Sequence, residues 1–386
     1  MDFELNDDQR AFQSTARQFA RDVMAPQAAE WDARQIFPKE VLRQAGELGF
    51  MALYTPEADG GIALGRLDSA IILEELAGAC PSTAAFISIH NMALGMIARY
   101  GTADARAQWC PGLTSGQQLA SYCLTEPNAG SDAGSLTTRA ERDGDQYRLN
   151  GGKAFISGAG DTDVLVVMAR TGEAGPKGIT AFAVPARAAG VSYGKKEEKM
   201  GWNSQPTRTI SFDNVAIPAS ARLGEEGQGF AIAMEGLDGG RINIATCSIG
   251  AAQACLQFAI AHVSERKQFG KRIADFQNTQ FKLADMQTEL VAARQMVRLA
   301  ASKLDNNHSE KSAYCAMAKR FATDAGFSIC NEALQLHGGY GYIREYPVER
   351  FLRDSRVHQI LEGTNEIMRV ILSRRLLIEG MTEILR

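Results

Sequence analysis

A single glutamate near the C-terminal end of the chain, Glu362, has the surroundings of a general base. An apolar stretch ends at Leu361, and the sequence Glu-Gly-Thr-Asn-Glu follows before apolar residues recur at helical spacing. Thr364 is a good N-cap for that helix, which places Glu362 in a tight turn just before the helix. Apolar neighbours remove water from a carboxylate and raise its pKa, as a base near neutral pH requires. The alternative interpretation is a solvated acid beside a helix N-terminus.

Two further residues of the same stretch concern ligands. Gly363, directly after the glutamate, leaves room for a flat ligand to approach the backbone closely. His358 lies four residues before Glu362, a spacing compatible with two metal ligands, but no third ligand lies nearby in the sequence. Because protein zinc sites use three or four side chains, the sequence predicts no metal.

The common phosphate-binding loops do not occur in this sequence. No G-x-G-x-x-G follows an expected strand, and there is no Walker A sequence, so a dinucleotide must be held in another way. Residues 122–132 read YCLTEPNAGSD and end in a turn that presents amides and a hydroxyl to a phosphate or carbonyl oxygen. The alternative is an ordinary polar transition from a strand to a turn.

Two later segments also have functional and structural interpretations. Residues 265–277, ERKQFGKRIADFQ, interrupt two long helical patterns with a basic loop. Arginine matches phosphate oxygens with two parallel hydrogen bonds, so this loop is either a pyrophosphate site or a solvated connector. Residues 335–350 end a helix in two glycines, which allow close backbone approach, and His337 there either bonds a ligand or is satisfied within the protein.

Three regions must position these motifs, and together they predict an α+β multidomain fold. Residues 1–117 form an N-terminal helical domain, in which Asn6 and Gln9 cap the first helix, Pro26 ends it and Pro38 opens the next. Residues 118–226 form an antiparallel, barrel-like β domain, and residues 227–386 form a C-terminal four-helix bundle. The further helical patterns cover about 67–79, 83–99, 103–110, 228–264, 276–305, 309–336 and 364–379.

The β region is marked by a change of hydrophobic period at Leu119. Segments such as DVLVVMAR and ITAFAVPA are short, rich in β-branched residues and bounded by Gly, Pro and Asp. The dipeptides at 143–144 (Asp-Gly) and 150–151 (Asn-Gly) are hairpin-turn signals.

Composition excludes several classes of protein. Hydrophobic residues make up 45% of the 386 residues and charged residues 22%, as in soluble globular proteins. A net charge of −4 argues against nucleic acid or an anionic membrane as a partner. We expect no apolar run of membrane-spanning length, no secretory signal and no transit peptide. The expected location is the bacterial cytoplasm, or the mitochondrial matrix for a processed eukaryotic chain. The seven scattered cysteines predict reduced thiols.

Five motifs in their order along the chain resemble the acyl-CoA dehydrogenase family of flavoproteins: YCLTEPNAGSD, KAFISGAG, RKQFG, QLHGGYGY and LEGTNEIMR. The resemblance covers essentially the whole chain. It implies an FAD-dependent α,β-dehydrogenation of an acyl-CoA thioester, with electrons passed to an electron-transferring flavoprotein. It also implies a homotetramer, a dimer of dimers in which the FAD site is shared between subunits.

Other segments resemble the branch of the family that acts on short branched acyl groups. These are SYCLTEP, GWNSQPTR, GGRINIA, DSRVHQILEGTNE, AEWD and ISIHNM. The expected reaction is isobutyryl-CoA to methacrylyl-CoA, as in valine catabolism, and butyryl-CoA or 2-methylbutyryl-CoA are the alternative substrates. A helical scaffold or nucleic-acid-binding relative that has lost catalysis is the alternative from another class. The acidic charge and the intact Glu362 argue against it.

The resemblance assigns roles to individual residues. Glu362 resembles the base that removes the α-proton, and its backbone N–H, with the flavin ribityl 2′-hydroxyl, resembles the pair of donors to the thioester carbonyl. The residues that resemble FAD contacts are Tyr122, Leu124, Thr125, Gly130, Ser131, Phe155, Ile156, Ser157, Arg266, Phe276, Gln277, Gln335, Leu336, His337, Gly338, Gly339, Thr364, Asn365 and Glu366. Those that resemble substrate contacts are Ser131, Asp238, Gly239, Gly240, Arg241 and Arg374.

Two positions depart from the family pattern. Many members have Tyr before the catalytic glutamate, where this chain has Leu361. Some branched-chain or long-chain members carry the base on an earlier helix, at a position that matches Gly240 here. Since glycine has no carboxylate, Glu362 is the only base that the resemblance offers.

Overall fold

The N-terminal third of the chain is helical. A computed structural model describes residues 4–378 and residue 385. The helices are α1 (Asp7–Phe19), α2 (Ala28–Arg34), α3 (Lys39–Glu47), α4 (Arg66–Ala79), α5 (Pro81–Tyr100) and α6 (Ala103–Thr114). The predicted cap of α1 is confirmed, because the Asn6 side chain accepts from the Gln9 backbone N–H and the Gln9 side chain accepts in return. The short helix α2 was not predicted from the sequence.

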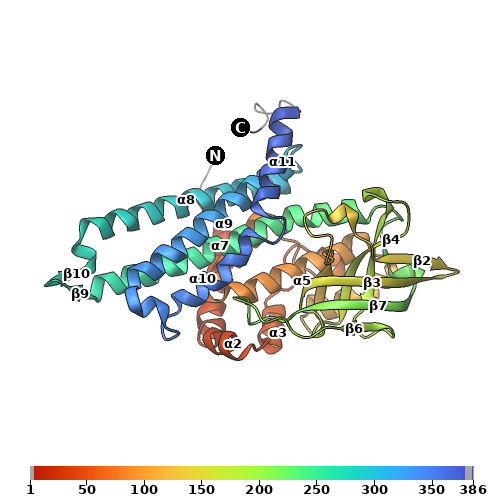
Figure 1. The fold of residues 1–386 in the computed structure, drawn as a ribbon, viewed down its shortest axis with the longest axis horizontal. Coiled ribbons are helices and arrows are strands. Elements are labelled where there is room, and N and C mark those ends of the chain that lie inside the picture. Colours follow the sequence, from red (N-terminus) through yellow and green to blue (C-terminus); the bar gives the residue numbers. More distant parts are fainter. Residues whose placement is uncertain (1–3, 379–384, 386) are drawn as a thin grey trace.

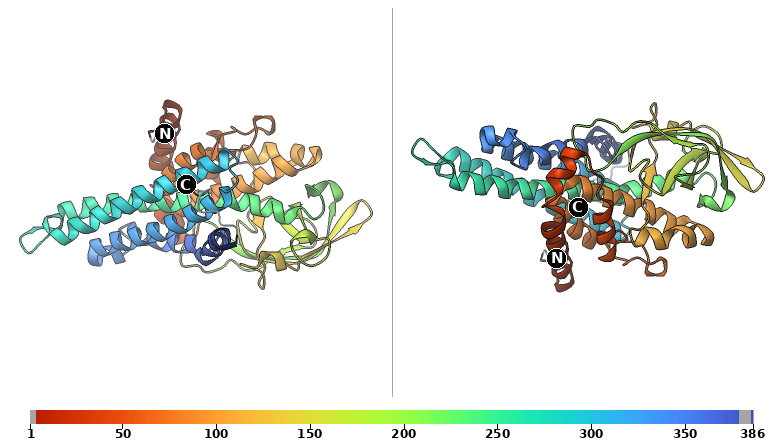
Figure 2. Two further views of the ribbon diagram at one scale, coloured as in Figure 1. Left: turned by 90° about the horizontal axis from the view of Figure 1, so that it is seen from above. Right: turned by 90° about the horizontal axis from the view of Figure 1, so that it is seen from below.

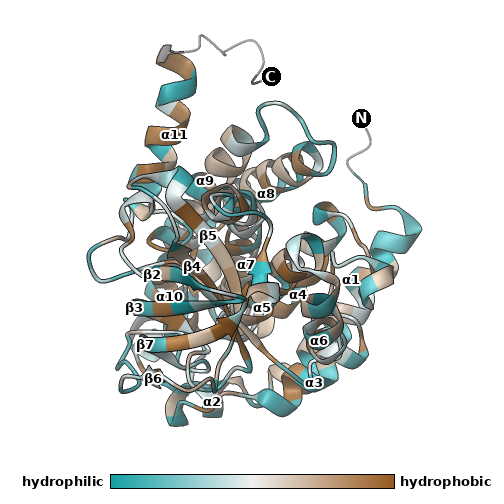
Figure 3. Cartoon of the chain, turned by 90° about the vertical axis from the view of Figure 1, so that its right-hand side faces the viewer, coloured by the Kyte–Doolittle hydropathy of each residue, from teal (hydrophilic) through white to brown (hydrophobic). Residues whose placement is uncertain are grey.

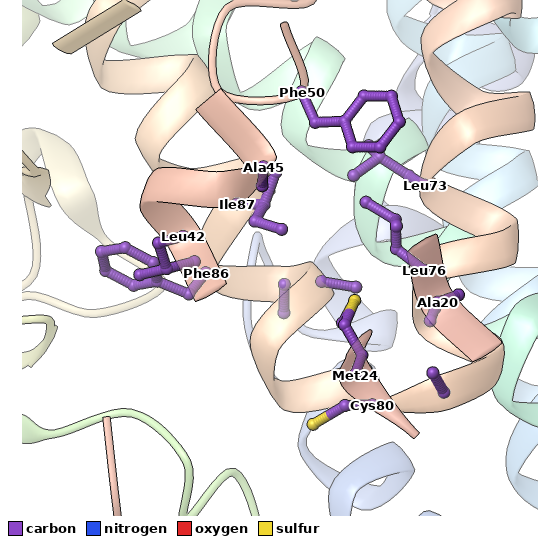
Figure 4. Close-up of a cluster of buried hydrophobic side chains, with 14 of the residues drawn as sticks. Ala20, Met24, Leu42, Ala45, Phe50, Leu73, Leu76, Cys80, Phe86 and Ile87 are labelled. Atoms are coloured by element: carbon purple, nitrogen blue, oxygen red, sulfur yellow. The ribbon is translucent and has the colours of Figure 1, made fainter. Parts of the chain in front are cut away.

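The helical domain shares its core with the C-terminal region. A cluster of buried side chains joins α3, α4 and α5, with Leu42, Phe50, Leu73 and Phe86 among its members (Figure 4). The same cluster includes Ile244 from the C-terminal region. Burial of this apolar surface stabilises the contact by roughly 25 cal/mol per Å², so the two helical regions form one body.

The middle region is an eight-stranded sheet at one end of the molecule (Figures 1 and 2). Seven strands run in the order β6-β7-β3-β2-β4-β5-β8, and β1 pairs with β4. The prediction of an antiparallel domain is wrong for two strand pairs, because both β1 and β2 run parallel to β4. The strands are β1 (Ala120–Cys123), β2 (Arg139–Asp143), β3 (Gln146–Ser157), β4 (Val164–Arg170), β5 (Ile179–Pro185), β6 (Val191–Tyr193), β7 (Thr207–Pro218) and β8 (Arg222–Leu223).

One of the two expected hairpin turns is absent. The turn after Asp143 is confirmed, with Gly144 at φ +64° between β2 and β3. The second prediction was wrong, because Asn150 and Gly151 lie inside β3. The pairing of β3 with β7 shifts register there, and Gly151 has φ +135°. A β-bulge needs the same backbone freedom as a turn, which explains the shared sequence signal.

Within the described residues, the C-terminal region contains three long α-helices and two shorter ones. They are α7 (Gly229–Glu265), α8 (Gln277–Asp305), α9 (Lys311–His337), α10 (Val348–Arg356) and α11 (Asn365–Ile378), with the hairpin β9 (Lys267–Gln268) and β10 (Lys271–Arg272) between α7 and α8. Helix α11 projects away from the other helices (Figures 1 and 3). Helix α10 was not predicted, and the expected end of the last helix at 379 lies outside the described residues.

Helix α7 corrects the expectation that no apolar run is long enough to span a membrane. It contains an 18-residue window with a mean hydropathy of 1.5, of which 72% is buried inside the protein. By length and composition alone this window would qualify. The same residues pack against α4, α8 and α9, so the hydropathy is that of a central core helix.

All seven cysteines are free and buried, which confirms the prediction of reduced, unbridged thiols. Burial raises the pKa of Cys123 and of Cys247 to about 12, so both are protonated at neutral pH. Among residues 4–378 and 385, no group of three His, Cys, Asp or Glu side chains forms a metal-binding cluster.

A buried ion pair fixes the segment after β1 against β3. Lys153 is 1% exposed and donates to Glu126 Oε1 at 2.8 Å and to the Leu124 carbonyl at 3.1 Å. The Glu126 carboxylate also accepts from the backbone of Thr137 and Thr138. Burial alone would raise the pKa of Glu126, but Lys153 and these hydrogen bonds lower it to about 2.

We expect Glu126→Ala to destabilise the protein by about 3–5 kcal/mol, because it leaves the Lys153 ammonium group buried and unpaired. Urea unfolding at pH 7 measures the loss, with exposed Glu141→Ala on β2 as the control. The folded pKa of Glu126 lies below its ordinary value, so its stabilisation is present above about pH 4.5 and fades as the pH falls towards about 2. Equal stability of the two variants at pH 7 contradicts this account.

Candidate active site

Glu362 occupies a left-handed turn immediately before α11. Its φ is +57°, and that of Gly363 is +87°. The Thr364 hydroxyl accepts from the Ile367 backbone N–H at 3.3 Å, which confirms the predicted N-cap. The Glu362 Oε2 atom is buried and has no hydrogen-bond partner in the described part of the chain. A non-glycine residue with positive φ costs roughly 1–2 kcal/mol, so the surroundings must hold this turn in place.

The electrostatics of Glu362 are those expected of a base. Burial raises its pKa to about 7, against the opposing positive charges of Arg241 and Lys319. The alternative of a solvated acid is therefore excluded. A pKa near the working pH leaves much of the carboxylate ionised at neutral pH while it keeps its affinity for a proton.

Two cations near the turn bond to backbone carbonyls. Arg241 Nε donates to the Glu362 carbonyl at 3.4 Å, and its Nη1 donates to Asp238 Oδ1 at 2.6 Å. Lys319 Nζ donates to the Gly363 carbonyl at 2.8 Å. Among the described residues, the Oε2 atom of the carboxylate is left without a hydrogen-bond partner. Sequence reasoning missed Lys319, and its one signal was a lysine within the apolar helical run CAMAKRFA.

The backbone amide of Glu362 is also without a partner. Within residues 4–378 and 385, no acceptor takes its N–H. The next two carbonyls along the chain, of Glu362 and Gly363, accept from the side chains of Arg241 and Lys319. An amide N–H without an acceptor is free to donate to a carbonyl oxygen.

Two glycines of α7 make room for charged side chains, one of them that of Glu362. A methyl group at Gly240 would lie 2.3 Å from Glu362 Oε2, and one at Gly239 would lie 2.4 Å from Arg66 Nη1. Gly240 is therefore in direct contact with the carboxylate. Gly363 serves a different purpose from the one expected: a methyl group there would lie 2.6 Å from Met368 Cε, so its role is the positive φ and close packing.

Of the predicted residues of β1 and the following loop, Tyr122 lies close enough to Glu362 to be affected by its charge. Burial and then the charge of Glu362 raise the pKa of Tyr122 well above its usual range. The Tyr122 hydroxyl is a second buried atom that has no partner among the residues the structure describes. Leu124 is buried and Thr125 half-buried. Gly130 and Ser131 are exposed, and the space beside Gly130 is open.

Phe155 is strained and exposed on β3. It has φ +57° at the second register shift of this strand, and 70% of the residue is exposed. Its neighbour Ile156 is buried, and the Ser157 carbonyl accepts from Ser121 Oγ at 2.7 Å. A large aromatic side chain held at the surface by a strained backbone is typical of a ligand-binding position.

A second group of predicted residues surrounds a cavity of about 400 Å³ between the end of α7 and the end of α9. Its lining includes Arg266, whose guanidinium lies 5.3 Å from the centre of the Tyr340 ring. In the described part of the chain, no atom lies within 4 Å of the position that a Cβ atom would take at Gly338 or at Gly339. The other predicted residues in this lining are Gln335, Leu336 and His337.

Other predicted residues of this region are satisfied within the protein. His337 Nδ1 contacts the Ala333 carbonyl at 2.7 Å, and its ring stacks on His262 with centroids 4.5 Å apart. The Lys271 Nζ atom lies 4.1 Å from the centre of the Phe276 ring. Gln277 is the first residue of α8. The β9–β10 hairpin at this site and the sheet lie at opposite ends of the molecule (Figures 1 and 2). One chain therefore does not bring Arg266 and Phe155 together.

The remaining predicted residues lie on or beside α11. Asn365 is buried in a network with α9, whereas Glu366 and Arg374 are exposed. Asp238 is buried in its ion pair with Arg241. The His358 ring bonds Trp202 at 3.2 Å and Ser248 at 2.8 Å, and burial lowers its pKa to about 3. Both ring nitrogens are thus engaged, which removes the metal pair with Glu362.

A helical domain, a β domain and a second helical domain that together enclose a buried, unpaired glutamate define a class of acyl-CoA-oxidising flavoenzymes. Family models for the acyl-CoA dehydrogenase N-terminal, middle and C-terminal domains match residues 6–117, 121–215 and 227–377. The chain belongs to the acyl-CoA dehydrogenase family, and it is an oxidoreductase.

Individual relatives agree with this assignment. Mitochondrial isobutyryl-CoA dehydrogenase of Dictyostelium discoideum is 55% identical, over 96% of this chain and 90% of the relative. The protein of the same name from Bos taurus is 52% identical, over 97% and 90%. The structure of butyryl-CoA dehydrogenase from Megasphaera elsdenii superposes with a TM-score of 0.94 at 39% identity, over 98% of this chain and all of that one.

We expect Gly240→Ala to reduce turnover by about 10²-fold while the protein stays folded, because the added methyl group displaces the end of the flexible Glu362 side chain. Activity and the thermal midpoint are measured together. The matched control is Gly78→Ala on α4, where the nearest atom to the added methyl group lies at 3.7 Å. Turnover of the Gly240→Ala variant close to wild type would show that the carboxylate has room to move.

Proposed function

We propose that this chain oxidises a short branched acyl-CoA thioester at its α and β carbons, and that the substrate is isobutyryl-CoA and the product methacrylyl-CoA. The observation that carries this proposal is the buried, unpaired Glu362 carboxylate, whose pKa is raised to about 7 by burial. The names of the two relatives above 50% identity support the choice of acyl group.

The residues of this chain divide the chemistry among them. Glu362 accepts the α-proton through its unpaired Oε2. The Glu362 N–H, which has no acceptor of its own within the described residues, donates to the thioester carbonyl and stabilises the negative charge that develops there. When bound, FAD supplies the acceptor for the β-hydrogen and its electron pair. The α and β C–H bonds break and one C=C bond forms.

Two groups of residues offer the kinds of contact that a bound FAD would need. In the β domain, Phe155 offers an exposed ring, Tyr122 a hydroxyl without a partner among the described residues, and Gly130 open space beside it. The cavity with Arg266 and the open Gly338–Gly339 turn offers a cation and room for a pyrophosphate. We propose that the first group holds the flavin ring and the second holds the pyrophosphate.

Because these two groups lie at opposite ends of one chain, the proposed FAD site joins two subunits. Exposed apolar residues on the outer helices support association: Phe281 and Val291 on α8 are 57% and 43% exposed, and Leu377 on α11 is 84% exposed. We propose a homotetramer that passes electrons to an electron-transferring flavoprotein. Sedimentation at equilibrium tests the first point, and flavin-dependent reduction of that acceptor tests the second.

We expect Glu362→Gln to keep FAD and bind acyl-CoA yet lose ~10²–10⁴-fold in the rate of flavin reduction. The wild-type rate should fall on the acid side of about pH 7, because protonation of Glu362 removes the base. Stopped-flow absorbance measures both, with exposed Glu47→Gln on α3 as the control. A Glu362→Gln variant that reduces its flavin within tenfold of wild type would assign the base to another residue.

The acyl group is tested by turnover with a panel of acyl-CoAs and an artificial electron acceptor. We expect isobutyryl-CoA to give the highest kcat/KM, with 2-methylbutyryl-CoA and butyryl-CoA lower. A hydrophobic pocket discriminates one methylene by only ~1–3 kcal/mol, or ~10–200-fold, so the secondary substrates should be measurable. A preference for hexanoyl-CoA or longer would overturn the substrate while leaving the dehydrogenase chemistry intact.

The residue before the base provides a sharper test of the same point. Leu361 is part of the apolar surroundings of the turn, and it packs against the N-terminal core cluster. Leu361→Tyr adds a ring beside the base, where isobutyryl-CoA carries its second α-methyl group. We expect it to lower kcat/KM for isobutyryl-CoA more than for butyryl-CoA, and equal losses on both substrates would count against this geometry.

A further inference from the structure

We infer that Lys319 is a positioning residue for the proposed base. Its buried ammonium group holds the Gly363 carbonyl and so fixes the left-handed turn that presents the carboxylate and backbone N–H of Glu362. The inference rests on the proposed function only in taking Glu362 as the base. It concerns a residue that no sequence motif singled out.

The position of Lys319 is unusual for a lysine. It lies on α9 with none of its surface exposed, and Nζ donates to the Gly363 carbonyl and to Asn365 Oδ1, each at 2.8 Å. Burying an ammonium group costs several kcal/mol unless its partners compensate. Here both partners are neutral oxygens, and both belong to the segment around the turn. The Lys319 ammonium group therefore donates its hydrogen bonds to the segment that forms the turn and not to a carboxylate.

The turn is tied to α9 on both sides. After the turn, Asn365 Nδ2 donates to Thr323 Oγ1 at 2.9 Å and to Asp324 Oδ1 at 2.7 Å. Before it, Gln359 Nε2 donates to the same Asp324 Oδ1 at 2.8 Å. Residues 319, 323 and 324 lie within about one and a half turns of one helix. A rigid helix thus sets the position of the segment from 359 to 365.

The strained conformation at the turn explains why such a clamp is needed. Glu362 has φ +57°, a conformation that persists in a non-glycine residue only where the surroundings over-determine it. Lys319 from α9 and Arg241 from α7 hold the two successive carbonyls. Without the bond from Lys319, the Gly363 carbonyl loses its anchor on α9 and the peptide between Gly363 and Thr364 is free to rotate. The turn that directs the Glu362 side chain is then held less firmly.

Charged and titratable groups approach Glu362 from four elements. These are Lys319 on α9, Arg241 on α7, Tyr122 on β1 and Tyr54 before α4. Burial lowers the pKa of Lys319 to about 7, and the charge of Glu362 opposes this effect. The other charges acting on Lys319 are those of Arg241, Asp324 and Glu366. Because the Lys319 charge lowers the pKa of Glu362, its removal should raise that pKa.

Three substitutions separate charge from packing: Lys319→Met removes both charge and donor, Lys319→Gln keeps a donor, and Lys319→Arg keeps the charge. We expect Lys319→Met to lower kcat by about 10²-fold with little change in KM or FAD content. The acidic limb of its pH profile should move to higher pH, and the isotope effect with α-deuterated substrate should increase. Lys319→Gln should show the same shift of the acidic limb, and Lys319→Arg should not.

The control is Lys282→Met, which removes an ammonium group on α8 that pairs with Glu332 away from the turn. A Lys319→Met variant with wild-type kcat overturns the inference. So does a loss of kcat in Lys319→Met and Lys319→Gln without a shift of the acidic limb of their pH profiles to higher pH. If Lys319→Met does not fold, the comparison of Lys319→Gln with Lys319→Arg decides by the same criterion. Failure of the proposed function would show separately, as an active Glu362→Gln enzyme.

Discussion

The constraint on which this structure depends is the burial of one carboxylate without a partner. Desolvation of Glu362 raises its pKa to about 7 and costs folding free energy, and a direct ion pair would remove both the cost and the reactivity. In this structure the two nearby cations do not form an ion pair with the carboxylate. Lys319 and Arg241 are close enough to moderate the charge, yet their hydrogen bonds go to backbone carbonyls. The pKa of Glu362 stays raised because Lys319 and Arg241 donate to the backbone carbonyls of the turn and not to the Glu362 carboxylate.

Three elements from different parts of the chain surround Glu362. Helix α7 brings Gly240 against the carboxylate, α9 brings Lys319 beneath the turn, and β1 brings Tyr122 from the sheet. The two helices pack along much of their length and share one apolar core cluster, so their relative positions are fixed. The turn itself is short and strained. Its geometry is therefore set by rigid elements that are distant in sequence, as a precise catalytic group requires.

Local signals predicted the features that depend on neighbouring residues. The Asn6 cap, the Thr364 cap and the buried turn at Glu362 were all readable because each involves fewer than ten residues. Features that depend on distant partners were not. The Asn150–Gly151 pair became a bulge because β7 continues to pair on both sides of it. Lys319 was missed because its acceptors lie more than forty residues away along the chain. The hydropathy of α7 reports burial by other helices, which composition alone cannot distinguish from burial in a membrane.

The contact between Gly240 and Glu362 limits where a base can be located in this fold. A single methyl group at position 240 would already lie 2.3 Å from the Glu362 oxygen, so a carboxylate carried by α7 would need the space that Glu362 fills. The two positions compete for one volume, and two buried carboxylates there would also repel each other. Only one can be occupied by an acid at a time. In this chain the glycine on α7 leaves the space to the turn before α11, and the catalytic geometry consequently depends on whatever holds that turn.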